Sequence, residues 1–488
     1  MQKIWRCFIV LIVGFMIAAV TDAKGDTAAG KQLLKLARSH FTNDLWFAEE
    51  TMFRNRGTVD CTPTDNTNEC SAKNDTNTDH AASWSTNRKI RADRLTWLCT
   101  DSDALKLVSD DGIQIIDARI ISNSGETNTL NFEKACFPVR MEGCNIEAVL
   151  RVNNAHLSCL DLTGTHITQN LDAYQVAVDH DVALEHGFKA DGQVNFYVAH
   201  IGGDFDCSGG SFCNPNTNSD SFVLAVMGTK IAGYAYLDGD FEGKVIFRNS
   251  SVDNDFDWYG VTNADKTILD LSWLKVQRFQ DDEKSWPKAN NLFLDGFTYD
   301  EIIGTHDSIT PAGRIRWLGL QPTNTFYAQP YQQLATVLRE RGYEDEATTV
   351  MIEKNVAQSH FTTRFSLSWW WYNAFGWFIN YGYRPVRAIW FSVGFILIGW
   401  IFSSSRLFSP TDKVNAYVNE STVLDTAYPK FTGFIYSLET FIPFLKLGVA
   451  DYWHPTGGAL RVYFWIHIIA GWILTTLLVG ALTGLIKT

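Results

Sequence analysis

The chain has 488 residues, of which 46% are hydrophobic and 19% are charged. This composition excludes a disordered or fibrous chain, and the length is sufficient for two or three domains. Lysine and arginine total 41 against 54 aspartates and glutamates, which gives a formal net charge of -13. Such a balance offers no broad basic surface for a phosphate backbone, so we expect no nucleic-acid partner.

The N-terminus resembles a secretory signal. Lys3 and Arg6 precede an uncharged apolar run, Cys7 to Val20, and small residues follow as far as Ala23. The run is short for a helix that spans a bilayer, so we predict a cleaved signal peptide over 1–23, with an uncleaved anchor as the alternative. In either case the following segment should be exported.

The C-terminal region has the composition of a membrane domain. Two stretches, at about 388–405 and 462–486, are almost free of charge and approach the ~20 apolar residues that a membrane-spanning helix needs. The stretch 431–445 is interrupted by Glu439 and Pro443. We therefore predict two transmembrane helices with a short half-helix, or a segment lying on the membrane surface, between them.

Basic residues are more numerous between the two predicted spans than just before the first. This bias favours a cytoplasmic loop between the spans and an exported middle region. We therefore expect the protein in a bacterial inner membrane, in contact with the lipid bilayer, with its middle region in the periplasm.

Nine cysteines are present, and eight of them follow the predicted signal. An even number in an exported chain permits disulfides. Cys61 and Cys70 bracket a polar loop and are the pair that we expect to be bonded, with Cys207 and Cys213 as a second candidate pair. No Cys-x-x-Cys motif occurs and no histidine pair has ligand spacing beside these cysteines, so no metal site is predicted.

A regular apolar ladder occupies the middle of the chain. Apolar residues two positions apart recur every 10 to 12 residues, and an insertion at 214–221 delays the series once. A spacing of two places both side chains on one face of a strand. The pairs are Leu150/Val152, Leu160/Leu162, Leu171/Ala173, Val182/Leu184, Val194/Phe196 and Phe205/Cys207, then Leu224/Val226, Ala235/Leu237, Val245/Phe247 and Phe256/Trp258.

This ladder predicts an all-β solenoid, β-helix-like, with a strand step of 10–11 residues and two steps in each coil of roughly 20–22 residues. Phe205 and Val245 are predicted to point inward. Apolar residues between the pairs, such as Leu157, Ile167 and Ile201, are predicted at the corners. The alternative is an antiparallel sandwich, whose strands rarely keep so uniform a spacing.

Solenoid ends need caps, and the flanking segments contain helical patterns. Residues 330–355 have helical periodicity in two pieces that are separated at Gly342, which predicts a helical hairpin. The predicted order is a signal peptide (1–23), an N-terminal helical cap with a polar insertion (24–95), the β-solenoid (96–300), a linker and helical hairpin (301–364), and a membrane region (365–488).

Several motifs resemble those of one group of bacterial proteins. They include His200-Ile-Gly-Gly-Asp-Phe-Asp-Cys, Ser285-Trp-Pro, Leu294-Asp-Gly-Phe-Thr-Tyr, Gln329-Pro-Tyr-Gln-Gln and Gly382-Tyr-Arg-Pro. The group consists of membrane-associated, repeat-bearing proteins of poorly defined function that are often labelled oxidoreductases. The resemblance extends from about residue 95 to the C-terminus.

The residues themselves give little support to redox chemistry. Gly202-Gly203 and Gly209-Gly210 fall at predicted coil corners with no helix after them, so neither forms a dinucleotide-binding turn. His467, on the second predicted span, could serve quinone or haem chemistry, but one histidine supplies at most one ligand. We expect no cofactor.

Aspartates are frequent at outward positions of the ladder. Asp161, Asp172, Asp206 and Asp257 lie between the paired apolar residues, and Asp204 lies at a nearby corner. Two carboxylates held ~5–9.5 Å apart could act as general acid and base on a glycosidic bond. The interpretation that we favour is a solvated acidic face that keeps the solenoid soluble.

A channel is a third class to consider. Span, interrupted segment and span resemble a two-helix channel, with Tyr436-Ser-Leu-Glu-Thr440 where a pore helix would lie, but 444–448 lacks the carbonyl filter sequence and contains Lys446. We therefore predict a membrane-anchored cell-envelope β-solenoid that binds or scaffolds an envelope protein or a polysaccharide. The alternative is a carbohydrate-active enzyme or glycan binder; a channel-like or redox membrane protein ranks behind both.

Overall fold

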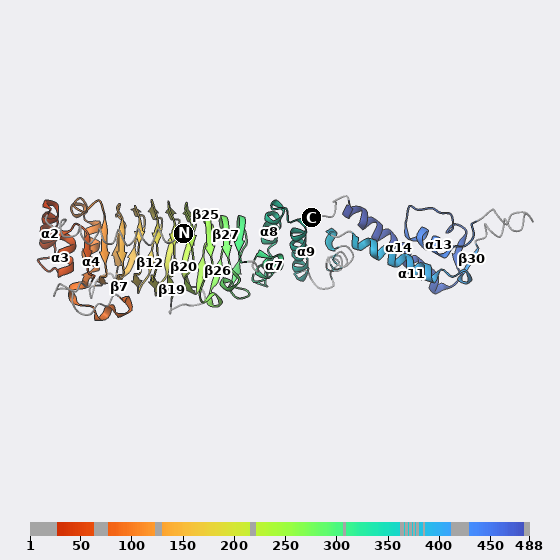
Figure 1. Cartoon of the computed structure of the whole chain (residues 1–488), viewed down its shortest axis with the longest axis horizontal. Helices are drawn as coiled ribbons and strands as arrows, with labels where there is room; N and C mark the ends of the chain where they lie inside the picture. The colour runs from red at the N-terminus through yellow and green to blue at the C-terminus, as the bar shows by residue number, and fades with distance from the viewer. Residues whose placement is uncertain are drawn as a thin grey trace, which may run out of the picture. The chain divides into compact units, whose positions relative to one another are not determined.

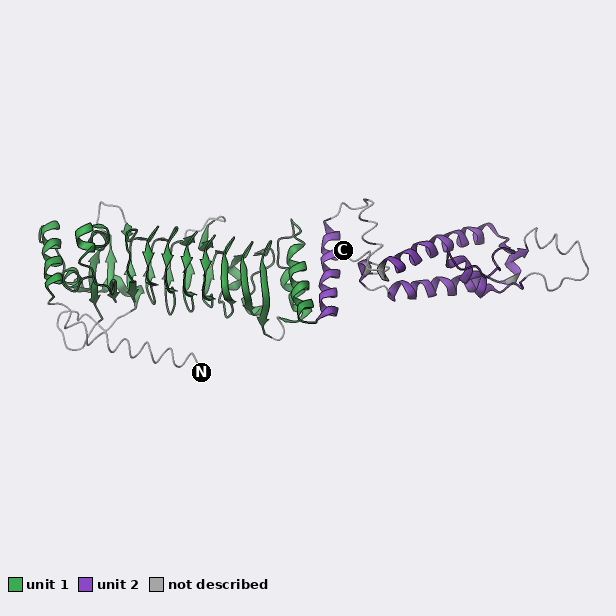
Figure 2. Cartoon of the chain, turned by 90° about the horizontal axis from the view of Figure 1, so that it is seen from above, with its two compact units in different colours: residues 1–342 green, residues 343–488 purple. Residues whose placement is uncertain are grey.

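The computed structural model describes residues 27–62, 77–122, 129–214, 221–305, 309–361, 386–410 and 429–482, together with part of 366–383. The chain divides into two compact units, residues 1–342 and residues 343–488 (Figure 2). The predicted signal peptide, 1–23, lies outside the described residues.

Unit 1 is a β-solenoid, as the apolar ladder predicted (Figure 1). Its described strands lie in four columns, and each strand pairs in parallel with strands of the neighbouring coils. One column counts the coils, because it contains eight strands: β5 (Thr129–Asn131), β8 (Val149–Arg151), β12 (Leu171–Asp172), β16 (Val194–Tyr197), β20 (Phe222–Met227), β24 (Lys244–Ile246), β26 (Ile268–Asp270) and β28 (Leu292–Phe293).

The column that positions the candidate site is β1 (Thr58–Asp60), β3 (Ile113–Ile116), β6 (Val139–Glu142), β10 (Leu160–Asp161), β14 (Val182–Ala183), β18 (Phe205–Asp206), β22 (Ala235–Tyr236), β25 (Ser251–Trp258), β27 (Lys275–Asp281) and β29 (Thr298–Gly304). A third column contains β2 (Lys89–Arg91), β4 (Arg119–Ile121), β7 (Asn145–Ile146), β11 (His166–Ile167), β15 (Lys189–Ala190), β19 (Ser211–Cys213) and β23 (Asp240–Glu242). The fourth contains β9 (His156–Leu157), β13 (Ala177–Val178), β17 (His200–Ile201) and β21 (Lys230–Ile231), which joins β25.

The register stacks like positions of successive coils directly on one another. Leu160 pairs with Val182, and Val182 pairs with Phe205. All three are fully buried, as is Val245, so the inward orientation predicted for Phe205 and Val245 is confirmed. Because no coil can bury its apolar side alone, the stack shares one continuous core.

Two details of the predicted solenoid were wrong. Leu157, Ile167 and Ile201 were expected at corners, but they lie in two-residue strands, β9, β11 and β17. Such strands are too short to show an alternating pattern, and parallel pairing with neighbouring coils stabilises them. The solenoid also begins before residue 96, because β1 and β2 pair with β3 and β4.

Helices close the N-terminal end of the solenoid. They are α2 (Ala28–His40), α3 (Phe47–Arg54), α4 (Ala92–Thr100) and α5 (Ser102–Leu105), and the short helices η1 (Thr78–Ser83) and η2 (Thr86–Arg88) lie nearby in the chain. A buried ion pair connects this cap to the first coil: Arg91 Nη2 lies 2.7 Å from Glu49 Oε2, and Glu49 is fully buried.

The C-terminal end is closed by α7 (Pro311–Leu318) and α8 (Gln329–Glu340). Gln329 and Gln333 donate side-chain hydrogen bonds to the carbonyl oxygens of Phe297 (2.9 Å) and Tyr299 (2.7 Å). These bonds satisfy backbone groups at the last strand, which would otherwise offer a free edge. The short helices η3 (Ala264–Lys266) and η4 (Glu283–Ser285) lie between late strands of the solenoid.

A second buried ion pair connects α7 to the solenoid. The Nη1 and Nη2 atoms of Arg314 donate to the two carboxylate oxygens of Asp281 at 2.8 and 2.6 Å, and Trp286 Nε1 donates to the same carboxylate at 2.9 Å. Asp281 is 0% exposed and Arg314 is 2% exposed. A buried pair with this geometry is costly to break, because either partner alone is an uncompensated charge.

Unit 2 contains α9 (Glu344–His360), η5 (Asn380–Gly382), α11 (Val386–Phe402), η6 (Ser405–Leu407), β30 (Phe408–Pro410), α13 (Gly433–Phe441), β31 (Trp453–Pro455) and α14 (Gly458–Leu482). The predicted helices around Gly342 are present as α8 and α9, and α13 lies in the stretch where a half-helix was one of the two predictions.

One helix in the described part of the chain, α14, is long and apolar enough over Gly458–Gly480 to cross a membrane. The other predicted span corresponds to α11, an apolar helix of 17 residues. At 1.5 Å per residue α11 is about 26 Å long, slightly less than the ~30 Å hydrocarbon core. Residues 483–486 of the predicted second span lie outside the described residues.

The first prediction concerns the ladder. Phe205→Asp should destabilise the solenoid by several kcal/mol, because it buries an unpaired charge among stacked apolar side chains. Thermal unfolding of the full chain in detergent measures the effect. Val198→Asp, the same kind of substitution at a position of this coil that is 54% exposed, is the matched control and should change stability little. An unchanged melting temperature for Phe205→Asp would contradict the register.

The second prediction concerns the C-terminal cap. Arg314→Leu should cost about 3–5 kcal/mol because it leaves the buried Asp281 carboxylate without its partner. The double variant Arg314→Leu/Asp281→Leu should recover most of that loss. Urea unfolding measures both, and a double variant no more stable than the single one would show that the ion pair is not the source of the loss.

Candidate functional site

An acidic stripe follows one edge of the solenoid. Its carboxylates come from successive coils of the β1-to-β29 column, either from outward strand positions or from the corner just after each strand. Their negative charges raise the pKa of neighbouring carboxyls in the stripe. The members are Asp60, Asp117, Glu142, Asp161, Glu185 and Asp206.

The centre of the acidic stripe is a pair of carboxyl groups, Glu185 and Asp206. The two side chains are hydrogen-bonded to each other, and Glu185 Oε2 also lies 2.9 Å from Nδ1 of His186. Burial, followed by the negative charge of Asp206, raises the pKa of Glu185 to about 7, while His186 acts in the opposite direction. Two like charges at this distance cannot both ionise easily, so the pair tends to share one proton.

The same causes act farther along the acidic stripe. Burial and the charge of Asp161 raise the pKa of Glu142. Burial also raises the pKa of Asp117, although the guanidinium of Arg88 opposes the shift. Burial thus raises the pKa of three members of the acidic stripe, Asp117, Glu142 and Glu185.

The structure brings together some of the aspartates that the sequence analysis singled out. Asp161 and Asp206 lie in the acidic stripe, and Asp257 lies farther along the same column, where Tyr236 stands in register between Asp206 and Asp257. Asp204 is at the corner before β18, where its Oδ1 accepts a hydrogen bond from the backbone N–H of Tyr234 at 2.9 Å.

Asp172 does not join this group. It lies in β12, in the eight-stranded column, where Asn195 Nδ2 donates to its Oδ1 at 3.2 Å. Sequence reasoning also missed Glu185, which comes two residues after an outward alanine. The only signal for it was its place in the repeat, at the corner where earlier coils carry Glu142 and Thr163.

The chemistry open to the acidic stripe is limited by its geometry. Glu185 and Asp206 interact directly, whereas the two carboxyls of a retaining glycosidase stand ~5–5.5 Å apart on either side of a glycosidic bond. Among the described residues, no three His, Cys, Asp or Glu side chains are grouped so that they could hold a metal ion.

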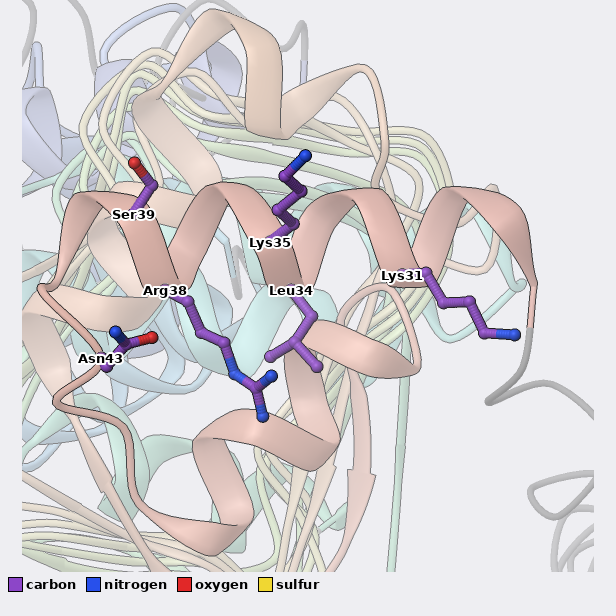
Figure 3. A pocket seen from close by; sticks show the side chains of 6 residues that line it. All are labelled: Lys31, Leu34, Lys35, Arg38, Ser39 and Asn43. Carbon is purple, nitrogen blue, oxygen red and sulfur yellow. The ribbon is translucent and has the colours of Figure 1, made fainter.

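A different, basic hollow lies on the N-terminal cap. It has a volume of about 460 Å³ and is lined by Lys31, Leu34, Lys35, Arg38, Ser39 and Asn43, mostly from α2 (Figure 3). Glu50 Oε1 accepts hydrogen bonds from Arg38 Nε (3.2 Å) and Nη2 (2.8 Å), which neutralises part of the positive charge.

The cysteines are distributed through unit 1. Cys61 is buried beside β1, whereas Cys70 lies outside the described residues, so their disulfide stays a prediction. The second candidate pair was wrong: Cys207 is fully buried in the core, whereas Cys213 points outward with its Sγ 3.8 Å from Glu242 Oε2. Cys207 has the inward orientation of Phe205, two residues before it, whereas Cys213 follows the inward Phe212 and therefore points outward. The two thiols thus lie on opposite sides of the solenoid backbone.

His467, the residue considered for redox chemistry, is fully buried in unit 2. Its Nε2 lies 3.1 Å from the carbonyl oxygen of Ser437, so this nitrogen carries the hydrogen, and aromatic rings surround the imidazole. The histidine therefore connects α14 to α13.

Comparisons with protein-family models, with curated proteins and with solved structures gave no match to this chain.

The third prediction concerns the pH dependence of stability. The folded-state pKa of Glu185, about 7, is above its ordinary value of 4.5, so the protonated form favours folding. The contribution of Glu185 to the free energy of unfolding is therefore fully present below about pH 4.5 and is lost as the pH rises through 7. The loss should be about 1–2 kcal/mol, because solvent screens part of the interaction of a half-buried group.

Glu185→Gln removes this titration, so the variant should be more stable than the wild type at pH 8 and equally stable at pH 5. Urea midpoints of the full chain between pH 4.5 and 8 measure the difference. Glu133→Gln, at another corner of the solenoid, is the control and should keep the wild-type profile. Parallel profiles for wild type and Glu185→Gln would contradict the carboxyl pair.

Proposed function

We propose that the protein is a membrane-anchored β-solenoid of the bacterial cell envelope that binds or scaffolds a partner, and that the acidic stripe is its binding surface. The observation that carries the proposal is the alignment of carboxylates from successive coils along one edge. A row of acidic side chains fixed on a rigid wall is complementary to a row of positive charge, and such complementarity sets specificity and association rate.

The membrane part of the proposal rests on α14. Its predominantly apolar segment of 23 residues, Gly458–Gly480, is long enough to cross the hydrocarbon core. An anchored solenoid would be held at one surface, and we propose the periplasmic face of the inner membrane. The resemblance to membrane-associated repeat proteins supports the same arrangement.

The partner that fits the acidic stripe best is an envelope protein with a basic surface. A polysaccharide is the second candidate, and one observation favours it: the rings of Tyr234 and Tyr236 are stacked at 5.7 Å near Asp206 and Asp257. Flat aromatic faces beside carboxylates suit the apolar faces and hydroxyls of sugars.

The fourth prediction tests the proposed binding surface. A photoreactive amino acid introduced at Asp206 of the full chain in living cells should give a discrete covalent adduct on irradiation. The same residue at Asn195, an outward position in β16, is the matched control and should give none. Asp206 and Asn195 are both half-buried outward residues, so a difference in exposure to solvent does not account for a difference in cross-linking. They lie in different columns of the solenoid, and only Asp206 belongs to the acidic stripe.

The nature of the adduct distinguishes the partners. An adduct whose tryptic fragments contain peptides of a second protein supports a protein partner, whereas an adduct that glycoside hydrolases shorten supports a polysaccharide. Washing spheroplasts with high salt before irradiation should weaken the adduct, because screening shortens the reach of exposed charges. Absence of an adduct at 206, or equal adducts at 206 and 195, would contradict the acidic stripe as the binding surface.

A further inference from the structure

In unit 2, the end of α11 and the start of α14 are fastened together. Strands β30 and β31 pair in an antiparallel manner, so that Phe408 is opposite Pro455. The backbone N–H of Thr456 also donates to the carbonyl oxygen of Leu407 at 3.0 Å. If both helices are in a membrane, these two helix ends lie at the same side of it.

The segment that leads into α13 starts from that same side. Trp453 Nε1 donates to the carbonyl oxygen of Pro429 at 3.2 Å, and the rings of Phe408 and Phe431 stack at 4.6 Å. A Cβ atom at Gly433 would clash with the carbonyl oxygen of Ser403, just beyond α11. The first turn of α13 is therefore beside the end of α11.

From there α13 runs inward between the two longer helices. Ser437, in its middle, donates to the carbonyl oxygen of Ile396 at 2.8 Å and accepts from His467 at 3.1 Å. The last residue of α13, Phe441, lies directly against Gly471 of α14. A Cβ atom added to Gly471 would clash with the carbonyl oxygen of Phe441. Because Gly471 lies 13 residues after the start of α14, α13 ends at roughly 20 Å along that helix, at 1.5 Å per residue.

The chain then turns and returns to the side from which it came. Glu439 accepts four consecutive backbone hydrogen bonds, from Leu447 and Gly448 at 3.1 and 2.9 Å and from Val449 and Ala450 at 2.8 and 2.9 Å. Three residues farther on, the chain is in β31, beside β30. The carboxylate of Glu439 thus holds the returning backbone against α13.

The turn itself, residues 442–448, is irregular backbone at the depth where α13 ends. Phe444 is 76% exposed and Leu447 is 44% exposed, and Lys446 is exposed between them. Irregular backbone does not face lipid inside a membrane; it occurs there only where protein covers it or where it lines a water-filled cavity. A lysine is equally costly among acyl chains.

We propose that residues 429–457 form a re-entrant loop and that its turn, residues 442–448, packs against the same turn of a second copy of this chain. The proposal rests on the membrane anchoring put forward above. A re-entrant loop explains why α13 is only nine residues long and why Glu439 accepts the backbone N–H groups of the returning segment. The second copy explains what keeps lipid away from the turn. Copies grouped around such turns are the arrangement in which a two-helix unit can line a water-filled path.

The experiment uses introduced cysteines, because all nine native cysteines lie at or before Cys213 and unit 2 has none. Alkaline extraction of membranes comes first: a full-length chain released by carbonate would overturn the anchor, and the re-entrant loop with it. If the chain is retained, sealed right-side-out and inside-out vesicles are prepared from cells that express the Thr432→Cys or the Thr456→Cys variant. A maleimide that cannot cross the membrane is then applied to each. Both should be labelled from the same side, and labelling from opposite sides would overturn the re-entrant loop alone.

Cross-linking tests the second copy. Phe444→Cys in native membranes should give a covalent dimer on oxidation, and Leu447→Cys should do the same if the first variant fails to accumulate. Ile401→Cys is the matched control, because Ile401 is 75% exposed but lies on the regular helix α11, where lipid can cover it. Dimers from the turn but not from Ile401 are the expected result. No dimer from either turn position, or equal dimers from all three, would overturn the packing of one turn against another.

Discussion

The whole of unit 1 depends on parallel register between neighbouring coils. Many of its strands are only two residues long, so they depend on hydrogen bonds to the neighbouring coils. Register places Leu160, Val182 and Phe205 on one another in the core. It fixes the outward residues in the same way: Ala183 stands in register between Asp161 and Asp206, while Glu185 lies at the corner of the intervening coil. From Glu142 to Asp206 the acidic stripe therefore alternates between a corner and an outward strand position of neighbouring coils, which lie ~5 Å apart.

The two ends of the stack solve one problem with similar chemistry. A solenoid that simply stopped would present an unpaired edge and an open core. At each end a buried arginine pairs with a buried carboxylate, Arg91 with Glu49 and Arg314 with Asp281. Burying an ion pair gains little net stability, but it penalises any misplacement of the cap, because a shifted cap would leave a charge unpaired. The caps are thereby held in one position.

The repeating apolar pairs were sufficient to predict the solenoid, but features that depend on contacts between coils or between helices were not predicted. The spacing of Phe205/Cys207 and its equivalents was sufficient for the solenoid, because few folds other than a solenoid keep a two-residue period at so constant a step. The four-column cross-section was missed, since strands such as His166–Ile167 show no alternation of their own. Glu185 was missed because its burial and its bond to Asp206 depend on which coils are neighbours. The contacts of Ser437 with Ile396 and His467 join three helices, and no local pattern in the sequence predicts them.

The quasi-one-dimensional core gives the solenoid a particular response to mechanical force. Each coil contacts only the coils before and after it, so tension applied along the stack would detach coils singly instead of breaking the whole domain at once. Paired positions are 23 residues apart between Val182 and Phe205, so one detached coil would release about 75 Å of chain at ~3.3 Å per residue. Pulled from its C-terminal side, the chain would lose the hydrogen bonds of Gln329 and Gln333 and then the ion pair between Arg314 and Asp281 before the last coil could detach, so the cap sets the force at which extension begins.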